Sequence, residues 1–237
     1  MDARDAEGLT VRETLERDGA VLAPSLLSEA QIETLRALAD EVVGGRPGAR
    51  LRGHAELAAI LSPDGPVGAL AARLTSDAAR PVRAVMFDKT PEANWTVAWH
   101  QDRVIPVRER HEVEGFGPWS TKDGVLHVAP PFAVLAQMIT VRVHLDPVDA
   151  GNAPLRVALG SHRLGRVPSD AATREADALS QRVCLAKAGD VWAYSTPILH
   201  ASDRADPPRR RRVLQVDYAD FELPSELQWL GLSQASE

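Results

Sequence analysis

The chain has 237 residues, of which 44% are hydrophobic and 25% are charged, as expected of a globular protein that buries a core. The formal net charge of −6 disfavours a general nucleic-acid-binding protein, which needs a basic face to neutralise phosphates. The single cysteine, Cys184, excludes an intrachain disulfide, and no apolar run approaches the roughly 20 residues of a membrane-spanning helix. No apolar segment of a signal peptide follows the charged N-terminus, so we expect a soluble cytoplasmic protein.

Residues 1–80 are expected to be mainly helical. Thr10 and Ser28 each precede a helical pattern and are followed three residues later by Glu or Gln, which is the arrangement of a capping box. The turn signals Asp18-Gly19 and Gly44-Gly45 end these two helices. The expected elements are helices over 10–18 and 28–43, a strand over 20–23 between them, and shorter helices over 54–61 and 66–79.

From residue 81 onward, apolar and polar residues alternate over short segments, which predicts strands. Helices first and strands afterwards indicate the α+β class, with a sandwich or barrel rather than a parallel βαβ sheet. We interpret residues 1–237 as a single domain with a helical part over 1–80 and a strand core over 81–222. The expected strands cover 81–89, 95–102, 133–145, 156–159, 181–185, 190–194 and 211–218.

Residues 103–131 form an unusual stretch between two expected strands. The stretch contains several glycines and prolines, shows little periodicity, and is longer than an ordinary loop of a compact domain. Its aromatic residues Phe116 and Trp119 could close over a ligand or simply anchor the loop to the core. We predict that 103–131 is the lid of an active site.

The strongest chemical motif is Trp99-His100-Gln101-Asp102. Side chains at positions i and i+2 of a strand share one face, so His100 and Asp102 can bind one metal ion together. His200, which follows the strand expected over 190–194, is the best candidate for a third ligand. Two imidazoles and one carboxylate form the facial triad of non-haem Fe(II) oxygenases, which leaves coordination positions open. A His-x-Asp triplet often arises by chance, so this interpretation depends on further residues.

Arg209 to Arg212 form a run of four arginines at the start of the strand expected over 211–218. Because neighbouring residues of a strand point to opposite faces, one or two of these side chains can point inward. An inward guanidinium would bind the carboxylate of a 2-oxo acid that occupies the open metal positions. The alternative is a solvated surface or a nucleic-acid patch, which the net charge of −6 disfavours.

Together these segments resemble the phytanoyl-CoA dioxygenase family, a branch of the Fe(II)- and 2-oxoglutarate-dependent oxygenases. The resemblance runs from Asp18-Gly19 to Asp217-Tyr218. Ala153, in place of the family's usual glycine, and Ala158-Leu159 depart from the pattern and affect loop geometry rather than metal ligands. The matching segments are Phe87-Asp88-Lys89, Trp99 to Asp102, Gly151 to Leu155, Gly160-Ser161-His162, Pro197 to Ser202, and Arg211.

The resemblance implies a double-stranded β-helix (jelly-roll, cupin-like) core with the N-terminal helices packed on one side. It implies that His100, Asp102 and His200 bind Fe(II). The implied reaction uses Fe(II), 2-oxoglutarate and O2 to hydroxylate a small-molecule metabolite, with release of succinate and CO2. The retained Asp102 favours hydroxylation, because related halogenases have a small residue at that position that leaves room for chloride.

The resemblance also assigns residues to the cosubstrate. It selects Arg211 from the arginine run as the anchor of 2-oxoglutarate. Lys89 and Ser202 are placed beside this anchor. Gln137 is our choice for the polar residue of the long strand, expected over 133–145, that reaches the cosubstrate.

Two other functions are compatible with these residues. A cupin-like isomerase could use the same ligands for zinc or manganese, because ligand type alone does not select among divalent ions. A non-catalytic barrel could bind a small acid. An inward arginine favours the oxygenase over the isomerase, and iron-dependent consumption of 2-oxoglutarate would separate all three. No extended basic patch suited to coenzyme A is evident, which favours a small free metabolite as the substrate.

Overall fold

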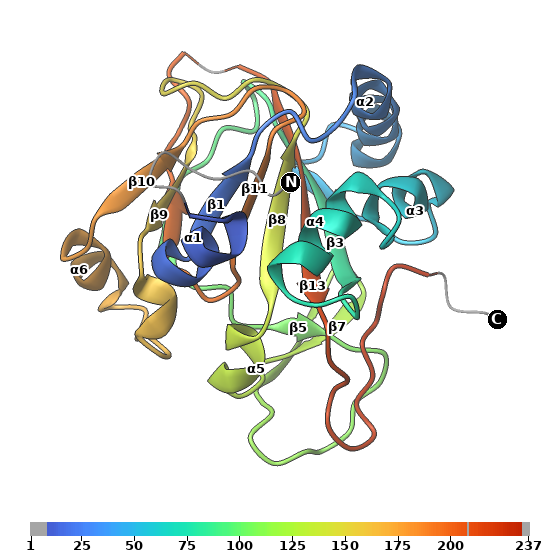
Figure 1. The fold of residues 1–237 in the computed structure, drawn as a ribbon, viewed down its shortest axis with the longest axis vertical. Coiled ribbons are helices and arrows are strands. Elements are labelled where there is room, and N and C mark those ends of the chain that lie inside the picture. Colours follow the sequence, from blue (N-terminus) through green and yellow to red (C-terminus); the bar gives the residue numbers. More distant parts are fainter. Residues whose placement is uncertain (1–8, 208, 234–237) are drawn as a thin grey trace.

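Helices from the N-terminal part of the chain pack against antiparallel sheets built mainly from the rest (Figure 1). The computed structural model describes residues 9–207 and 209–233. The charged N-terminus, on which the expectation of no signal peptide rests, and the outermost ends of the predicted domain lie outside the described residues. Within the described ranges, no helix has both the length and the apolar character needed to cross a membrane.

The first two helices begin at the predicted caps. Both have a complete capping box, at Thr10 and at Ser28. Gly19 and Gly44 end them in the left-handed conformation, with φ of 80° and 56°. The elements of this part are α1 (Val11–Asp18), β1 (Ala20–Ala23), α2 (Glu29–Val43), β2 (Gly48–Arg50), α3 (Ala55–Leu61) and α4 (Pro66–Leu74).

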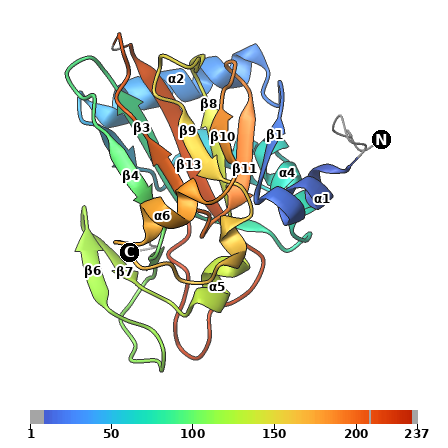
Figure 2. The same cartoon turned by 90° about the vertical axis from the view of Figure 1, so that its left-hand side faces the viewer.

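Two antiparallel sheets make up the core. The larger sheet has the order β1-β11-β8-β13-β3-β2 and the smaller sheet the order β10-β9-β12-β4. Figure 2 shows β4 and β9 in front of β3 and β13. The strands not yet given are β3 (Arg80–Lys89), β4 (Val97–His100), β8 (Ile139–His144), β9 (Leu155–Ala158), β10 (Gln181–Cys184), β11 (Val191–Ser195), β12 (His200–Ser202) and β13 (Arg211–Ala219).

The larger sheet is buried on both faces, and alternation along β8 explains how. Val141 and Val143 point to one face and join the largest apolar cluster, which also holds the buried faces of α1, α2, α3 and α4. Arg142 and His144 point to the other face, toward the smaller sheet. The N-terminal helices therefore cover one side of the larger sheet, and its other side carries polar residues between the two sheets.

The expectation that residues 103–131 form a long loop without secondary structure is wrong, and their role as a lid stays a prediction. This segment contains β5 (Ile105–Pro106), β6 (Trp119–Lys122) and β7 (Val125–Val128), which form a separate sheet of order β5-β7-β6. Asp123 and Gly124 join β6 to β7 with φ of 48° and 74°, the conformation of a tight two-residue hairpin turn. Phe116 is buried in a separate apolar cluster, and Trp119 packs against the same cluster. Both aromatic residues therefore anchor this segment rather than close over a ligand.

Five strands expected after residue 80 are confirmed to within one residue at each end: 81–89, 156–159, 181–185, 190–194 and 211–218. The strand expected over 95–102 is shorter, because β4 ends at His100. The prediction of a strand over 133–145 is wrong in its first half. Pro131 is followed by the short helix α5 (Phe132–Ala136), and β8 begins only at Ile139. Helix α6 (Ala172–Asp177) was not predicted.

Candidate metal centre

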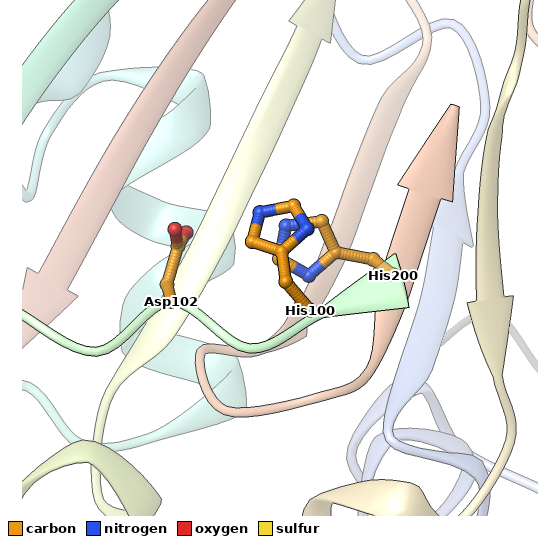
Figure 3. Close-up of side chains that lie close together, drawn as sticks. All are labelled: His100, Asp102 and His200. Atoms are coloured by element: carbon orange, nitrogen blue, oxygen red, sulfur yellow. The ribbon is translucent and has the colours of Figure 1, made fainter. Parts of the chain in front are cut away.

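The three predicted metal ligands lie together at one end of the smaller sheet. His100 on β4 is the cross-strand partner of His200 on β12, with ring centroids 4.2 Å apart. Asp102 follows β4 by two residues, and one ligand atom from each of the three side chains lies within 4.8 Å of the others. Figure 3 shows the three side chains extending into the same space. Two neutral nitrogens and one carboxylate oxygen can hold one divalent ion here.

Backbone carbonyls orient both imidazoles. Nδ1 of His100 lies 2.8 Å from the carbonyl oxygen of Ala98, and Nδ1 of His200 lies 2.9 Å from that of Ile198. A carbonyl can only accept, so Nδ1 carries a proton in each ring, and in the neutral ring Nε2 keeps its lone pair. This is the usual outer-shell arrangement of metal-binding histidines.

The electrostatic environment keeps His200 and Asp102 in their metal-binding forms. Burial lowers the pKa of His200 to about 4, so its imidazole is neutral at pH 7. Burial by itself would raise the pKa of Asp102, but the positive charges that face it, that of Arg83 among them, outweigh burial, and the net shift is downward. Arg83 lies 3.7 Å from Asp102 Oδ2, and the amide of Gln215 lies 3.5 Å from the same oxygen.

Gln101, between the two β4-side ligands, points away from them and connects three segments. Its Nε2 donates to the carbonyls of Gly165 and Pro197, and its Oε1 accepts from the amide of Val167. Pro197 belongs to the turn before His200, so one buried side chain fixes the two histidine-bearing segments to each other. The sequence motif identifies the ligands of this site, but not this structural role of its middle residue.

Ser161 supports the third ligand from the other side. Its hydroxyl accepts a 2.8 Å hydrogen bond from the amide of Leu199, the residue before His200. Gly160 beside it has φ of 80°, a conformation that favours glycine. The Gly160-Ser161-His162 segment therefore has a structural role, because Ser161 fixes the backbone next to His200.

A cavity of about 510 Å³ opens in front of the candidate ligands. Its walls come from both sheets and from the edge strand β2, so it lies between layers of the sandwich. A metal ion held by the three ligands would face this space. The lining residues used below are Arg46, Arg50, Arg83, Phe87, Lys89, His100, Asp102, Asp123, Arg142, His200, Ser202, Arg211 and Gln215.

Only one of the four consecutive arginines points into this cavity. Arg209, Arg210 and Arg212 are paired with Asp149, Asp88 and Asp146 at 2.6 to 2.9 Å. Arg211 is buried, lines the cavity, and makes no ion pair with any residue that the structure describes. Strand alternation therefore leads to the expected result, with one inward guanidinium.

Two other residues assigned to the cosubstrate also line the cavity. Lys89 is the cross-strand partner of Arg211, and its ammonium group donates to the carbonyls of Trp95 and Asp203. Burial, together with Arg211 and Arg142, lowers the pKa of Lys89 to about 8. Ser202 lies on β12 and is buried at the cavity wall. Three polar groups thus surround one region of the cavity, and two of them are cationic.

Ala153 adopts the conformation for which glycine is common. Its φ is 49°, in the left-handed region, and its carbonyl accepts a hydrogen bond from Arg211. The second carbonyl that Arg211 contacts, at 3.4 Å, belongs to Asn152. The loop that departs from the family pattern therefore holds the cavity arginine despite its strained alanine.

The expectation that Gln137 reaches the cosubstrate from the long strand is wrong in its structural premise. Gln137 ends helix α5, is exposed, and donates back to the carbonyl of Ala133. The polar residue of β8 that lines the cavity is Arg142, which the sequence analysis missed. Gln215 was also missed, although alternation from Arg211 along β13 would have found it.

A sandwich of antiparallel sheets that holds two histidines and an aspartate beside a cationic cavity defines a candidate facial-triad metalloprotein. The model of the family described as Phytanoyl-CoA dioxygenase (PhyH) matches residues 15–213. The chain belongs to this family. No curated protein matches the sequence.

Solved structures of low sequence identity have a similar fold. The epimerase SnoN, in complex with Fe3+, α-ketoglutarate (2-oxoglutarate) and nogalamycin RO, is 17% identical with a TM-score of 0.66, over 89% of this chain and 82% of that chain. HygX from Streptomyces hygroscopicus, with nickel, 2-oxoglutarate and hygromycin B bound, is 14% identical with a TM-score of 0.60, over 88% and 86%. EctD from S. alaskensis, in its apoform, is 17% identical with a TM-score of 0.62, over 94% and 80%.

Proposed function

We propose that this protein is an Fe(II)- and 2-oxoglutarate-dependent dioxygenase that hydroxylates a small-molecule metabolite, with release of succinate and CO2. The observation that carries the proposal is one cavity in which His100, Asp102 and His200 converge and Arg211 lies buried without an ion-pair partner among the described residues. Family membership and the fold shared with SnoN, HygX and EctD support the same conclusion.

We further propose that the core is a double-stranded β-helix. Its eight strands would be β3, β4, β8, β9, β10, β11, β12 and β13. Along the chain they lie in the large, small, large, small, small, large, small and large sheet. A pair of antiparallel strands wound into a jelly roll has this alternation, and the orders β11-β8-β13-β3 and β10-β9-β12-β4 support it.

The ligand set fits Fe(II). The Nδ1 atoms of His100 and His200 are held by backbone carbonyls, which leaves Nε2 of each ring to face the metal. The neutral imidazole of His200 and the ionised carboxylate of Asp102 can bind the metal without losing a proton first. Bound iron with 2-oxoglutarate would activate O2 for oxidation of the substrate. The protein residues hold the ligands in place and shield the reaction between the two sheets.

Arg211, Lys89 and Ser202 suit the distal carboxylate of 2-oxoglutarate. A guanidinium binds a carboxylate through two parallel hydrogen bonds, and the Lys89 ammonium and Ser202 hydroxyl lie on the neighbouring cavity wall. A buried arginine without an ion pair is costly, and an anionic cosubstrate removes that cost. Gln137 is not part of this proposal.

Hydroxylation is the outcome that we favour. The carboxylate of Asp102 occupies the position at which related halogenases leave room for chloride. SnoN is an α-ketoglutarate-dependent epimerase, so the same cofactors serve other oxidative outcomes in proteins of this fold. Product analysis after turnover, by mass spectrometry, separates a gain of one oxygen atom from epimerisation or ring closure.

The proposed partner of the protein is a small molecule rather than a nucleic acid. The net charge of −6 supports this, and so does the pairing of Arg209, Arg210 and Arg212, outside the cavity, with aspartates. A cytoplasmic location is also proposed, on the evidence of one buried free cysteine, Cys184.

Turnover of 2-oxoglutarate tests the proposed function. Purified protein with Fe(II), ascorbate, 2-oxoglutarate and a panel of metabolites should release succinate, and His100→Ala and Asp102→Ala should abolish this release. His54→Ala, which changes a histidine outside the cavity, is the matched control and should retain it. Undiminished succinate release by the two ligand variants would refute the metal assignment. Metal binding without 2-oxoglutarate consumption would favour the cupin-like isomerase, and binding of acids without a metal requirement would favour the non-catalytic protein.

A further inference from the structure

The cavity carries more positive charge than the proposed cosubstrate needs. Six cationic side chains line it and only two carboxylates do, although the whole chain has a net charge of −6. A concentration of one sign of charge inside a low-dielectric cavity attracts ligands of the opposite sign. The six side chains are Arg46, Arg50, Arg83, Lys89, Arg142 and Arg211.

Three of the six have partners within the protein. Arg83 pairs with Asp217 at 2.7 Å and lies near Asp102. Arg50, on β2, pairs with Asp123 at the tip of the β6–β7 hairpin. Arg46 donates to two backbone carbonyls in the last turn of α2, where the helix dipole favours a cation. Lys89 and Arg211 belong to 2-oxoglutarate under the proposed function, which leaves Arg142.

Arg142 is buried in the cavity wall and lacks an anionic partner. Its side chain is 9% exposed, and Nη1 donates to Gln215 Oε1 at 2.9 Å. Its guanidinium lies 5.6 Å from the ring centre of Phe87, across β13 from its own strand. Arg142 makes no ion pair with any residue in the described ranges. A buried guanidinium without an anion is unfavourable, so an anionic ligand in the cavity would stabilise Arg142.

The position of Arg142 separates it from the proposed 2-oxoglutarate anchor. Its cross-strand partner on β13 is Gln215, four residues beyond Arg211, so the backbone positions of Gln215 and Arg211 are roughly 13 Å apart along the strand, although the charge of Arg142 still reaches Arg211 and lowers its pKa. Gln215 also contacts Asp102, so Arg142 belongs to the part of the cavity next to the metal ligands. The substrate must reach this part of the cavity, because oxidation takes place at the metal.

We propose that Arg142 binds a carboxylate of the substrate, and therefore that the substrate is a small organic acid. This proposal rests on the proposed function. The planar guanidinium offers two parallel donors to a carboxylate, and Gln215 and Phe87 restrict its orientation. One guanidinium charge matches one carboxylate, whereas a phosphate dianion would need a second free cation beside it.

Ligand-detected NMR on the Zn(II)-loaded protein with saturating 2-oxoglutarate tests the proposal without turnover. Zn(II) uses the same ligand types and is redox-inert. The probes are matched pairs of an acid and its primary amide: benzoate and benzamide, phenylacetate and phenylacetamide, and hexanoate and hexanamide. The wild-type protein should bind at least one acid about tenfold or more tightly than its amide, the discrimination expected from one charge-assisted hydrogen bond.

Three variants locate the carboxylate. Arg142→Gln should abolish the preference for the acid and leave the 2-oxoglutarate affinity within about threefold of wild type. Arg211→Gln should weaken 2-oxoglutarate instead. Arg156→Gln is the matched control, because Arg156 also lies over an aromatic ring, Trp99, but outside the cavity lining, and it should change neither affinity.

Several results would overturn the proposal. Equal binding of acids and amides, or no binding of any acid, removes the evidence for an acidic substrate. Loss of 2-oxoglutarate affinity in Arg142→Gln as large as in Arg211→Gln would assign Arg142 to the cosubstrate's metal-proximal carboxylate. A wild-type protein that binds no 2-oxoglutarate in the presence of Zn(II) would instead refute the proposed function, so the two failures are distinguishable.

Discussion

Arg211→Met tests whether the buried arginine exists for an anionic ligand. Burial, with Arg142 nearby, lowers the pKa of Arg211 from 12.5 to about 9. A pKa lowered by about 3.5 corresponds to about 5 kcal/mol of unfavourable free energy for the charged form. This penalty is fully present below pH 9, where Arg211 is charged in both the folded and the unfolded state. It would decrease only as the pH rises above 9.

The hydrogen bonds that Arg211 makes oppose this penalty in part. It donates to the carbonyls of Asn152 and Ala153, and loss of bonds from a charged donor costs about 3 kcal/mol in total. Methionine fills a similar volume without a charge. The metal-free Arg211→Met protein is therefore expected to be about 2 kcal/mol more stable to unfolding than the wild-type protein at pH 7.

Urea unfolding, followed by tryptophan fluorescence, measures this difference. The experiment is repeated with Zn(II) and with 2-oxoglutarate at a hundred times its dissociation constant. The 2-oxoglutarate should stabilise the wild-type protein by about 2.7 kcal/mol. It should add nothing to the stability of Arg211→Met beyond the effect of Zn(II). Arg209→Met is the control, because Arg209 is exposed and paired with Asp149, and its stability should change by less than about 0.5 kcal/mol. A less stable Arg211→Met that 2-oxoglutarate still stabilises would refute the reasoning.

Three further outcomes are expected. Gln101→Leu should lose about 3 kcal/mol of stability in urea, because three buried backbone groups lose their partner, and unchanged stability would contradict the role of Gln101. Ala153→Gly should gain up to about 1 kcal/mol in free energy of unfolding, because glycine accepts a φ of 49° without strain. Thermal unfolding measures this change, and a lower midpoint temperature in the variant would contradict it. The affinity for 2-oxoglutarate should fall as the pH rises through about 8, since only protonated Lys89 attracts a carboxylate. Calorimetric titration should find this fall in the wild-type protein and not in Lys89→Met. A fall in affinity that persists in Lys89→Met would show that another group causes it.

Much of the fold could be predicted because local signals agreed with the final structure. Capping boxes at Thr10 and Ser28 and glycines at the helix ends fixed α1 and α2, since these contacts span only a few residues. Five of the seven strands expected after residue 80 were found to within one residue at each end. The segment over 103–131 was misread, because its strands are short and its Asp123-Gly124 hairpin turn was not given its full weight.

The candidate site could be predicted only in part. His100 and Asp102 are two residues apart and their side chains meet as expected, although β4 ends at His100 and Asp102 lies just beyond it. Alternation along β13 leaves one arginine of the run pointing inward. Arg142 and Gln215 depend on which strands become neighbours, and that order is a property of the whole sandwich. The prediction for Gln137 was wrong for a local reason. Residues 132–136 form helix α5 after Pro131, and strand β8 begins only at Ile139.

The two candidate histidine ligands are adjacent in the smaller sheet but one hundred residues apart in the sequence. An unfolded chain would have to close a loop of that length before both imidazoles could reach one ion, at an entropic cost of roughly 4 to 5 kcal/mol. High metal affinity therefore belongs to the folded chain. During refolding, metal uptake should begin when β12 pairs with β4, so an absorbing probe ion such as Co(II) would time the assembly of this sheet.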